Sequence, residues 1–416
     1  MTQPTACLPH PDWCHWYQHL LAYMPRGVHW YHPLPPYYTG YEQGTLYDWD
    51  QYFEAILQIY TGYPNDYARN AVDIFLGTQE DDGFIARSAS PGQWAGFNFQ
   101  HRDMVKPFLA QILLLIYHQD GVINWLKDHE RYSKMVRYLK CWITRFDISK
   151  QGLSVWRHAQ HTGMDNHYER AGRIDKAKRN EPLYCEGVDL NAYLVRELLA
   201  MSQLAQILEY PDDAAEFAQL ARQRIEAMRL YLWDESEQIF YDRDARTGEL
   251  IRVKHVGIFA SMWAGVATED QASHMVNDHL LNEDEFWRPW PIPALAASEP
   301  TYTEGFIPGE NTNCCTWRGN TWVPTNYYTF QGLKRYGYDD VAKELAAKTL
   351  TLFDRGKFCE YYTSESGTGT GRKPFWGWTA LAMFMPIEHS LQIDPTLINA
   401  TNTAGSAMRQ WIKHQQ

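Results

Sequence analysis

Apolar residues recur every three or four positions along most of this chain, and this helical period constrains its fold more than any other sequence feature. Between residues 189 and 208, one buried stripe would consist of Leu190, Leu194, Leu198, Met201, Ala205 and Leu208. The same period predicts helices at about 13–24, 50–61, 65–78, 103–118, 122–146, 212–232, 256–266, 270–280, 322–335, 340–354, 375–387 and 404–414. A single β-hairpin is predicted from residues 238–241 and 249–253. We therefore expect an all-α fold.

Three similar segments separate predicted helices: Gly-Tyr-Pro-Asn-Asp at 62–66, Glu-Tyr-Pro-Asp-Asp at 209–213 and Gly-Tyr-Asp-Asp at 337–340. In each, the first helix ends and an Asn or Asp can cap the next, which is typical of an αα-hairpin. Helices paired in this way, with no linker between them, predict a single domain, residues 1–416, built as an (α/α)6 toroid with long loops over one mouth. An irregular helical domain is the alternative. An α-solenoid is disfavoured because the three turns are unevenly spaced.

The composition limits the partners of the chain. Fifty acidic residues against 38 basic ones give a net charge of −12, which is unfavourable for general nucleic-acid binding. No apolar run approaches the ~18 residues of a membrane span, and the first residues lack the pattern of a secretory signal. Seven scattered cysteines cannot form a fully paired disulfide framework. We expect a cytoplasmic protein that binds neither nucleic acid nor membrane; no sequence feature sets an oligomeric state.

Several chemistries lack their usual motif in this sequence. There is no zinc-binding spacing of Cys or His, no phosphate-binding GxxxxGK[ST], no GxSxG of serine hydrolases and no dinucleotide-binding fingerprint after a strand. We therefore predict neither a metal nor a cofactor. Aromatic residues make up 15% of the chain, which fits either a large core or a sugar site lined by flat rings. Glycosidases use a pair of carboxyl groups as acid and base, so carboxylates that lie among aromatic residues are typical of such a site.

Four segments combine acids with aromatic residues: Tyr47-Asp48-Trp49-Asp50-Gln51-Tyr52-Phe53, then Val155–Arg157 with Thr162-Gly163-Met164-Asp165-Asn166, then Thr316–Pro324, and finally Cys359–Tyr362 with Phe375–Ala380. Each also has a purely structural interpretation. Asp48 or Asp50 could cap a helix, Asp165 could simply form a turn, and the two tryptophans of the third segment could staple a helix start. In the fourth segment, a glycine-rich loop after Glu360 could act as a lid.

In this order the segments resemble the inverting glycosidases of glycoside hydrolase family 63 and the related family 37 trehalases. The resemblance includes Val188-Asp189-Leu190-Asn191-Ala192, runs from about residue 47 to 380, and is strongest to the compact branch that contains bacterial mannosylglycerate and glucosylglycerate hydrolases. It implies an (α/α)6 barrel, with Asp165 as the general acid and Glu360 as the general base. The substrate-binding residues that it implies are Tyr47, Trp49, Asp50, Trp156, Arg157, Asn166, Asp189, Trp317, Arg318, Trp322, Tyr361, Trp376 and Trp378.

The sequence departs from the family pattern at Thr162, His167, Tyr168, Asn320 and Thr321, which affects the leaving-group side most. The expected reaction is inverting, exo-acting hydrolysis of a terminal α-linked glucose or mannose from a small soluble glycoside, such as glucosylglycerate, mannosylglycerate or a short α-glucoside. An inverting pair of carboxyl groups would lie about 6.5–9.5 Å apart.

Several alternatives stay open on the sequence alone. The substrate could be trehalose, the enzyme could be a sugar isomerase or epimerase that uses His158, His161 or His255, or catalysis could have been lost from a sugar-binding protein. Asp189 could cap the helix that it opens. The basic loop 169–181 could place Arg170 or Arg173 against an acidic leaving group, or could simply be solvated.

Overall fold

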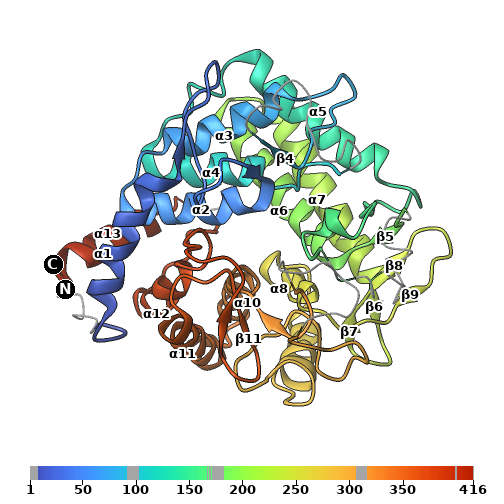
Figure 1. The fold of residues 1–416 in the computed structure, drawn as a ribbon. Coiled ribbons are helices and arrows are strands. Elements are labelled where there is room, and N and C mark those ends of the chain that lie inside the picture. The colour runs from blue at the N-terminus through green and yellow to red at the C-terminus, as the bar shows by residue number, and fades with distance from the viewer. Residues whose placement is uncertain are drawn as a thin grey trace.

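The computed structural model describes residues 8–90, 103–165, 167, 170, 182–305, 316–398 and 401–415. Helices dominate these residues, as Figure 1 shows, and the helical prediction is confirmed. The α-helices are α1 (Trp13–Tyr23), α2 (Asp48–Thr61), α3 (Asp66–Gly77), α4 (Leu109–Asp120), α5 (His129–Arg145), α6 (Val188–Ile207), α7 (Pro211–Tyr231), α8 (Ala260–Trp263), α9 (Glu269–His274), α10 (Val323–Arg335), α11 (Asp339–Gly356), α12 (Leu381–Leu391) and α13 (Ala404–Gln415). No helix among the described residues is long and apolar enough to cross a lipid bilayer.

The three similar turns do connect helices into hairpins, joining α2 to α3, α6 to α7 and α10 to α11. Gly62 ends α2 with a φ of 72°, a left-handed conformation that glycine adopts without strain. Pro211 opens α7 at its first turn, where a missing N–H costs no hydrogen bond. Gly62 and Pro211 therefore have the roles expected of them. The expected capping by Asn or Asp is wrong, because α3, α7 and α11 follow Asn65, Tyr210 and Tyr338 and none of these side chains makes a cap hydrogen bond.

The even-numbered helices pack against one another in chain order, α2 on α4, α4 on α6, α6 on α8, α8 on α10 and α10 on α12, and Figure 1 shows them grouped around the middle of the molecule. The last helix of this series, α12, also contacts the first, since the Tyr60 hydroxyl of α2 donates a 2.9 Å hydrogen bond to Glu388 of α12. Helix α13 also packs on both α2 and α12. The first and last inner helices are thereby neighbours.

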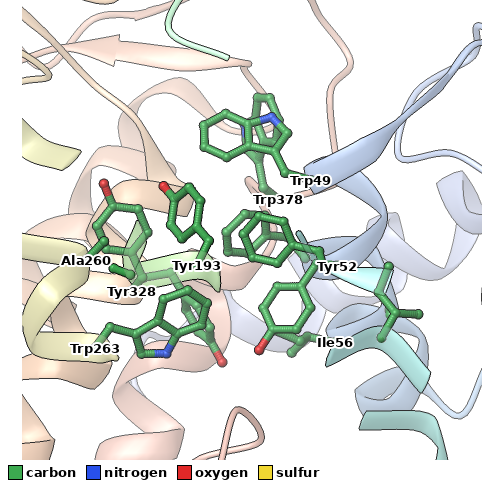
Figure 2. Packing of buried hydrophobic residues seen from close by; sticks show 14 of the residues in the cluster. Trp49, Tyr52, Ile56, Tyr193, Ala260, Trp263, Tyr328 and Trp378 are labelled. Carbon is green, nitrogen blue, oxygen red and sulfur yellow. The ribbon is translucent and has the colours of Figure 1, made fainter. Parts of the chain in front are cut away.

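Aromatic side chains fill the space between these helices. Figure 2 shows Tyr52, Tyr193, Trp263 and Tyr328 packed together, with Trp49 and Trp378 on one side of the cluster. The rings of Trp263 and Tyr328 stack with their centroids 5.9 Å apart. These buried rings form a floor. The first turn of α2, which carries Trp49, and the turn that carries Trp378 lie at one end of it.

The strands are short, and all five small sheets are antiparallel within the described residues: β1 (Val28–His29) with β2 (Tyr37–Tyr38), β3 (Leu46–Tyr47) with β4 (Ser88–Ala89), β5 (Cys185–Glu186) with β8 (Asp242–Asp244) and β9 (Leu250–Ile251), β6 (Trp233–Asp234) with β7 (Ile239–Phe240), and β10 (Asn320–Thr321) with β11 (Tyr361–Thr363) and β12 (Gly369–Thr370). The predicted hairpin across 242–248 exists, but β8 and β9 form it. Residues 239–240 pair with β6 instead, because Asp234 accepts hydrogen bonds from the backbone N–H groups of Ser236 and Glu237 and so closes an earlier tight turn.

Three predicted helices begin later than expected: 103–118 begins at Leu109, 122–146 at His129 and 375–387 at Leu381. The residues before Leu109 bond to neighbouring segments, with the Lys106 N–H donating to Asp48 over 2.8 Å. The residues before Leu381 do the same, since the Trp376 and Gly377 N–H groups both donate to the Gly40 carbonyl. Tertiary hydrogen bonds therefore replace helical ones at two of these starts, and both delayed segments reach the site described next.

Candidate active site

One cavity brings together both carboxylic acids that the sequence singled out. Asp165 and Glu360 enter it from segments far apart in the chain. The volume of the cavity that the centre of a water molecule can reach is about 180 Å³. Its lining consists of Tyr41, Tyr47, Trp49, Asp50, Arg87, Ser88, Gln160, Gly163, Asp165, Trp317, Trp322, Glu360, Arg372, Phe375 and Trp378. Eight of these were predicted, and the two acids share one aromatic chamber.

Asp165 follows a 3-10 turn, Gln160–Thr162, and Gly163. Gly163 has a φ of 86°, and an added Cβ would lie only 3.1 Å from both Trp49 and Lys106, so glycine lets this turn approach the cavity floor. Burial raises the pKa of the Asp165 carboxyl, while Arg87, whose Nη1 lies 3.9 Å from Asp165 Oδ1, opposes that rise. The balance favours a carboxyl that keeps its proton to higher pH than an exposed aspartate.

Glu360 precedes strand β11 and is held by the loop that follows the β11–β12 hairpin. Its N–H donates to the Arg372 carbonyl over 3.1 Å, and the Arg372 N–H donates to Glu360 Oε2 over 3.0 Å. Burial raises the pKa of Glu360, whereas the hydrogen bond and the charge from Arg372 lower it and nearby Asp165 raises it. The reciprocal bonds fix the direction of this carboxyl, and the one donated by the Arg372 N–H partly offsets the rise in its pKa.

A buried ion pair lies beneath Asp165. Lys106 Nζ is 3.0 Å from Asp48 Oδ1, both side chains are almost fully buried, and the ammonium group lies over the Trp49 ring. Asp50, two residues further along α2, lines the cavity. Burial, and after it the charge of Asp48, raises the pKa of Asp50 to about 7. The two acids of the Tyr47–Phe53 segment therefore differ in their environment. Asp48 pairs with Lys106 in the protein interior, whereas Asp50 faces the cavity.

Tryptophan rings form the walls. Trp317 and Trp322 stack with centroids 3.7 Å apart, and Tyr361 stacks on Trp322 from behind at 4.4 Å. Trp378 meets Trp49 edge to face, and its indole N–H donates to the Glu360 carbonyl over 3.1 Å. The aromatic walls and the candidate base are thus parts of one packed unit.

The other predicted binding residues lie outside the lining. Trp156 donates its indole N–H to Asp189, and both are fully buried. Arg157 lies over the Tyr184 ring, and Trp376 is buried with its indole N–H donating to the Tyr38 hydroxyl. Arg318 is buried near the cavity without lining it, as is Tyr361. Asn166 lies outside the described residues.

Arg170 lies within the protein rather than at a leaving-group pocket: it is fully buried and its guanidinium donates to Asp189 and Asp242. Arg173 falls outside the described residues. The histidines considered for isomerase chemistry are also elsewhere, because His158, His161 and His255 are buried and none lines the cavity.

Seven lining residues were missed by the motif comparison: Tyr41, Arg87, Ser88, Gln160, Gly163, Arg372 and Phe375. Gly163, Arg372 and Phe375 lie within or close to the motif segments in the sequence, and this closeness could have predicted their place at the cavity. Arg87 and Ser88 carried none, because Ser88 reaches the cavity through the pairing of β4 with β3, and Arg87 directly precedes β4 and bonds to the Asp103 carbonyl. Outside the cavity, His10, Asp12 and Asp354 form the one grouping of described side chains close enough to share a metal ion, and it lies at the surface.

The helical fold is shared with solved glycoside hydrolases. The crystal structure of a glycoside hydrolase family 63 mannosylglycerate hydrolase from Thermus thermophilus in complex with glucose matches with a TM-score of 0.70 and 20% identity, over 90% of this chain and 99% of that one. The same hydrolase in complex with Tris and D-glycerate matches with a TM-score of 0.70 and 19% identity, over 89% of this chain and 99% of that one.

Two curated relatives agree with this class. A mannosylglycerate hydrolase from another strain of Thermus thermophilus is 32% identical over 209 residues, which are 50% of this chain and 46% of that protein. The cytosolic neutral trehalase of Kluyveromyces lactis is 27% identical over 256 residues, 59% of this chain and 32% of that protein. The chain thus spans less than half the length of each. The model of the mannosylglycerate hydrolase MGH1-like glycoside hydrolase domain matches residues 45–379, and the chain belongs to that family.

Proposed function

We propose that this protein is an inverting, exo-acting α-glycoside hydrolase that releases a terminal α-linked glucose or mannose from a small soluble glycoside such as glucosylglycerate or mannosylglycerate. The observation that carries the proposal is that two carboxyl groups, the half-buried Asp165 and the buried Glu360, line one cavity walled by tryptophan. The proposed framework is a single (α/α)6 domain, residues 1–416, in which the even-numbered helices α2, α4, α6, α8, α10 and α12 form the inner layer.

Asp165 is the proposed general acid, which protonates the glycosidic oxygen as the bond to the anomeric carbon breaks. Its raised pKa supports this role, because a general acid must hold its proton near the working pH. Glu360 is the proposed general base, which takes a proton from the water that attacks the opposite face of the sugar. The hydrogen bond from the Arg372 N–H favours the carboxylate form that this step requires.

The remaining lining residues would hold the hexose. Flat rings such as Trp49, Trp317 and Trp378 suit the C–H faces of a pyranose, and Asp50 offers an oxygen to a sugar hydroxyl. The Thermus hydrolase was crystallised with glucose and with D-glycerate, which supports a hexose and a short carboxylate-bearing leaving group for the present protein.

Trehalose is the second candidate substrate, and the trehalase relative favours it. The two substrates share the first hexose and differ in the leaving group, so the same acid and base would serve both. An isomerase or epimerase has less support, because none of the three candidate histidines lines the cavity.

A proton NMR time course tests the proposal. The enzyme is mixed with glucosylglycerate, mannosylglycerate, trehalose and α-linked diglucosides, and the anomer of the released hexose is followed before mutarotation. We expect one substrate to disappear with β-hexose as the first product, and Asp165→Asn and Glu360→Gln to lose at least about 10²-fold in kcat. Release of the α-anomer first would contradict inversion, and unchanged activity of both variants would contradict the assignment of the acids.

A further inference from the structure

Arg170 lies five residues after Asp165, and its guanidinium group is fully buried among carboxylates. We propose that Arg170 is a positioning residue for the general acid: clamped by Asp189 and Asp242, it holds the chain that leaves Asp165 so that the carboxyl stays aimed into the cavity. This inference rests on the proposed function, since it concerns the acid of that reaction.

The clamp uses the planar fork of the guanidinium. Arg170 Nη1 and Nη2 donate to the two oxygens of Asp189 over 2.8 and 2.7 Å, and Nε donates to Asp242 Oδ2 over 2.7 Å. Three charge-assisted hydrogen bonds in one plane fix both the position and the orientation of this side chain. Lysine carries the same charge but cannot reproduce the fork.

Both carboxylates belong to well-anchored elements. Asp189 lies in the first turn of α6, where it also accepts hydrogen bonds from the Leu190 N–H and the Trp156 indole. Asp242 lies on β8 and accepts a hydrogen bond from the Val188 N–H at the start of α6. The clamp therefore ties Arg170 to the beginning of a long buried helix.

The chain before Asp165 is fixed against the same anchor. The Trp156 ring meets His161 edge to face at 4.8 Å, and His161 Nε2 lies 2.9 Å from the Met104 carbonyl. Trp156 and Arg170, which lie before and after Asp165 in the sequence, therefore both bind Asp189. Asp165 lies between these two residues in the sequence, and it lines the cavity.

A displaced general acid has a selective effect on the reaction. Departure of a sugar alcohol or glycerate requires a proton on the leaving oxygen, whereas fluoride leaves from an α-glycosyl fluoride with little need of one. Loosening the clamp should therefore slow hydrolysis of the glycoside and spare the fluoride. A defect in folding or in hexose binding would slow both substrates alike.

The test compares kcat/KM of Arg170→Lys on glucosylglycerate or mannosylglycerate, whichever the wild type prefers, and on the fluoride of the same hexose. We expect a loss of about 10²-fold on the glycerate glycoside, near the lower end of what general acid catalysis contributes, and less than about threefold on the fluoride. Asp165→Asn should show the same selectivity. Asp242→Asn, which removes the charge from one arm of the clamp, is the second variant should Arg170→Lys fail to fold.

Arg196→Lys is the matched control. Arg196 is a buried arginine on the same helix as Asp189, but it bonds to Gln111 and Thr396 away from the cavity. Any loss it causes should be equal on the two substrates. Equal losses in Arg170→Lys, or no loss at all in a folded variant, would overturn the positioning role. If wild type and Asp165→Asn both fail to hydrolyse the fluoride, the proposed function is wrong and this inference fails with it.

Discussion

Gly371 is the residue at which backbone conformation most directly controls the proposed base. Its φ is 74°, and an added Cβ would lie 2.8 Å from Glu360 Oε2 and 2.6 Å from the Tyr361 ring. Gly371→Ala should therefore push the carboxyl out of line and lower kcat by about 10²-fold, since a misplacement of about 1 Å can cost that much. Steady-state kinetics with the substrate identified by NMR would measure the loss.

Gly337 provides a control with the same backbone strain and no such contact. Its φ is 75°, and an added Cβ would meet nothing within 4 Å. Gly337→Ala should lower the free energy of unfolding by about 1 kcal/mol and leave kcat unchanged. Equal kinetic losses in the two variants would show that strain, rather than contact with Glu360, explains the effect.

The two arginines of the cavity should control opposite limbs of the pH profile. Arg87 lowers the pKa of Asp165, so Arg87→Gln should let the acid stay protonated to higher pH and move the alkaline limb of kcat/KM upwards. Arg372 lowers the pKa of Glu360, so Arg372→Gln should move the acidic limb upwards. The pH dependence of kcat/KM measures both shifts, and exchanged limbs would reverse the roles assigned to the two acids.

Among the elements, α12 is joined to two of its neighbours, α2 and α10, by hydrogen bonds that one buried carboxyl accepts. Glu388 accepts hydrogen bonds from Tyr60 of α2 and from Tyr327 and Gln331 of α10. Glu388→Ala leaves these donors unpaired, and we expect a loss of about 2–4 kcal/mol in the free energy of unfolding, measured in urea. Glu344→Ala, on the exposed surface of α11, should cost less than about 0.5 kcal/mol.

The same carboxyl predicts a pH-dependent difference in stability. Burial raises the pKa of Glu388 from 4.5 to about 7, so the folded protein binds this proton more tightly than the unfolded chain does. The stabilisation by Glu388 is therefore lost as the pH rises from 4.5 to about 7. Wild type should lose stability relative to Glu388→Gln across that interval; a difference that does not change with pH would contradict the raised pKa.

The elements also show what the sequence could predict. Helix periodicity and the Gly-Tyr-Pro turns are local signals, and they correctly indicated the helices and hairpins. The late starts of α4 and α12 were not predictable, because the backbone groups before them bond to Asp48 and Gly40, which are distant in the chain. Asp165 and Glu360 were found through motifs, whereas Arg87 lies at the cavity because of backbone contacts with Asp103 and the neighbouring strand β4, which are distant from any motif. The catalytic roles of Asp165 and Glu360 remain predictions.

At the scale of the whole molecule, the two ends of the described chain complete the helical framework. Trp411 of α13 packs edge to face against Trp13 of α1 at 5.0 Å, and Trp13 donates its indole N–H to the Met383 carbonyl of α12. Trp411→Ala should cost about 3–5 kcal/mol of unfolding free energy, measured by calorimetry. Lys413→Ala, on the exposed side of the same helix, should leave stability unchanged; equal effects would mean that this aromatic contact does not hold the ends together.

Gly40 and Gly377 cross so closely that an added Cβ on Gly40 would lie 2.0 Å from the Gly377 Cα. Because of this crossing, the structure around Gly40 cannot be completed until Gly377 has been synthesised. At about 5–20 residues per second, Gly377 leaves the ribosome roughly 20–70 s after Gly40. Throughout that interval the Gly40 carbonyl lacks the Trp376 and Gly377 N–H groups that bind it, and through most of it Glu360 has not been made. Catalytic activity should therefore appear only after Gly377 has been synthesised, so that an enzyme assay on nascent chains of increasing length would detect when this crossing forms.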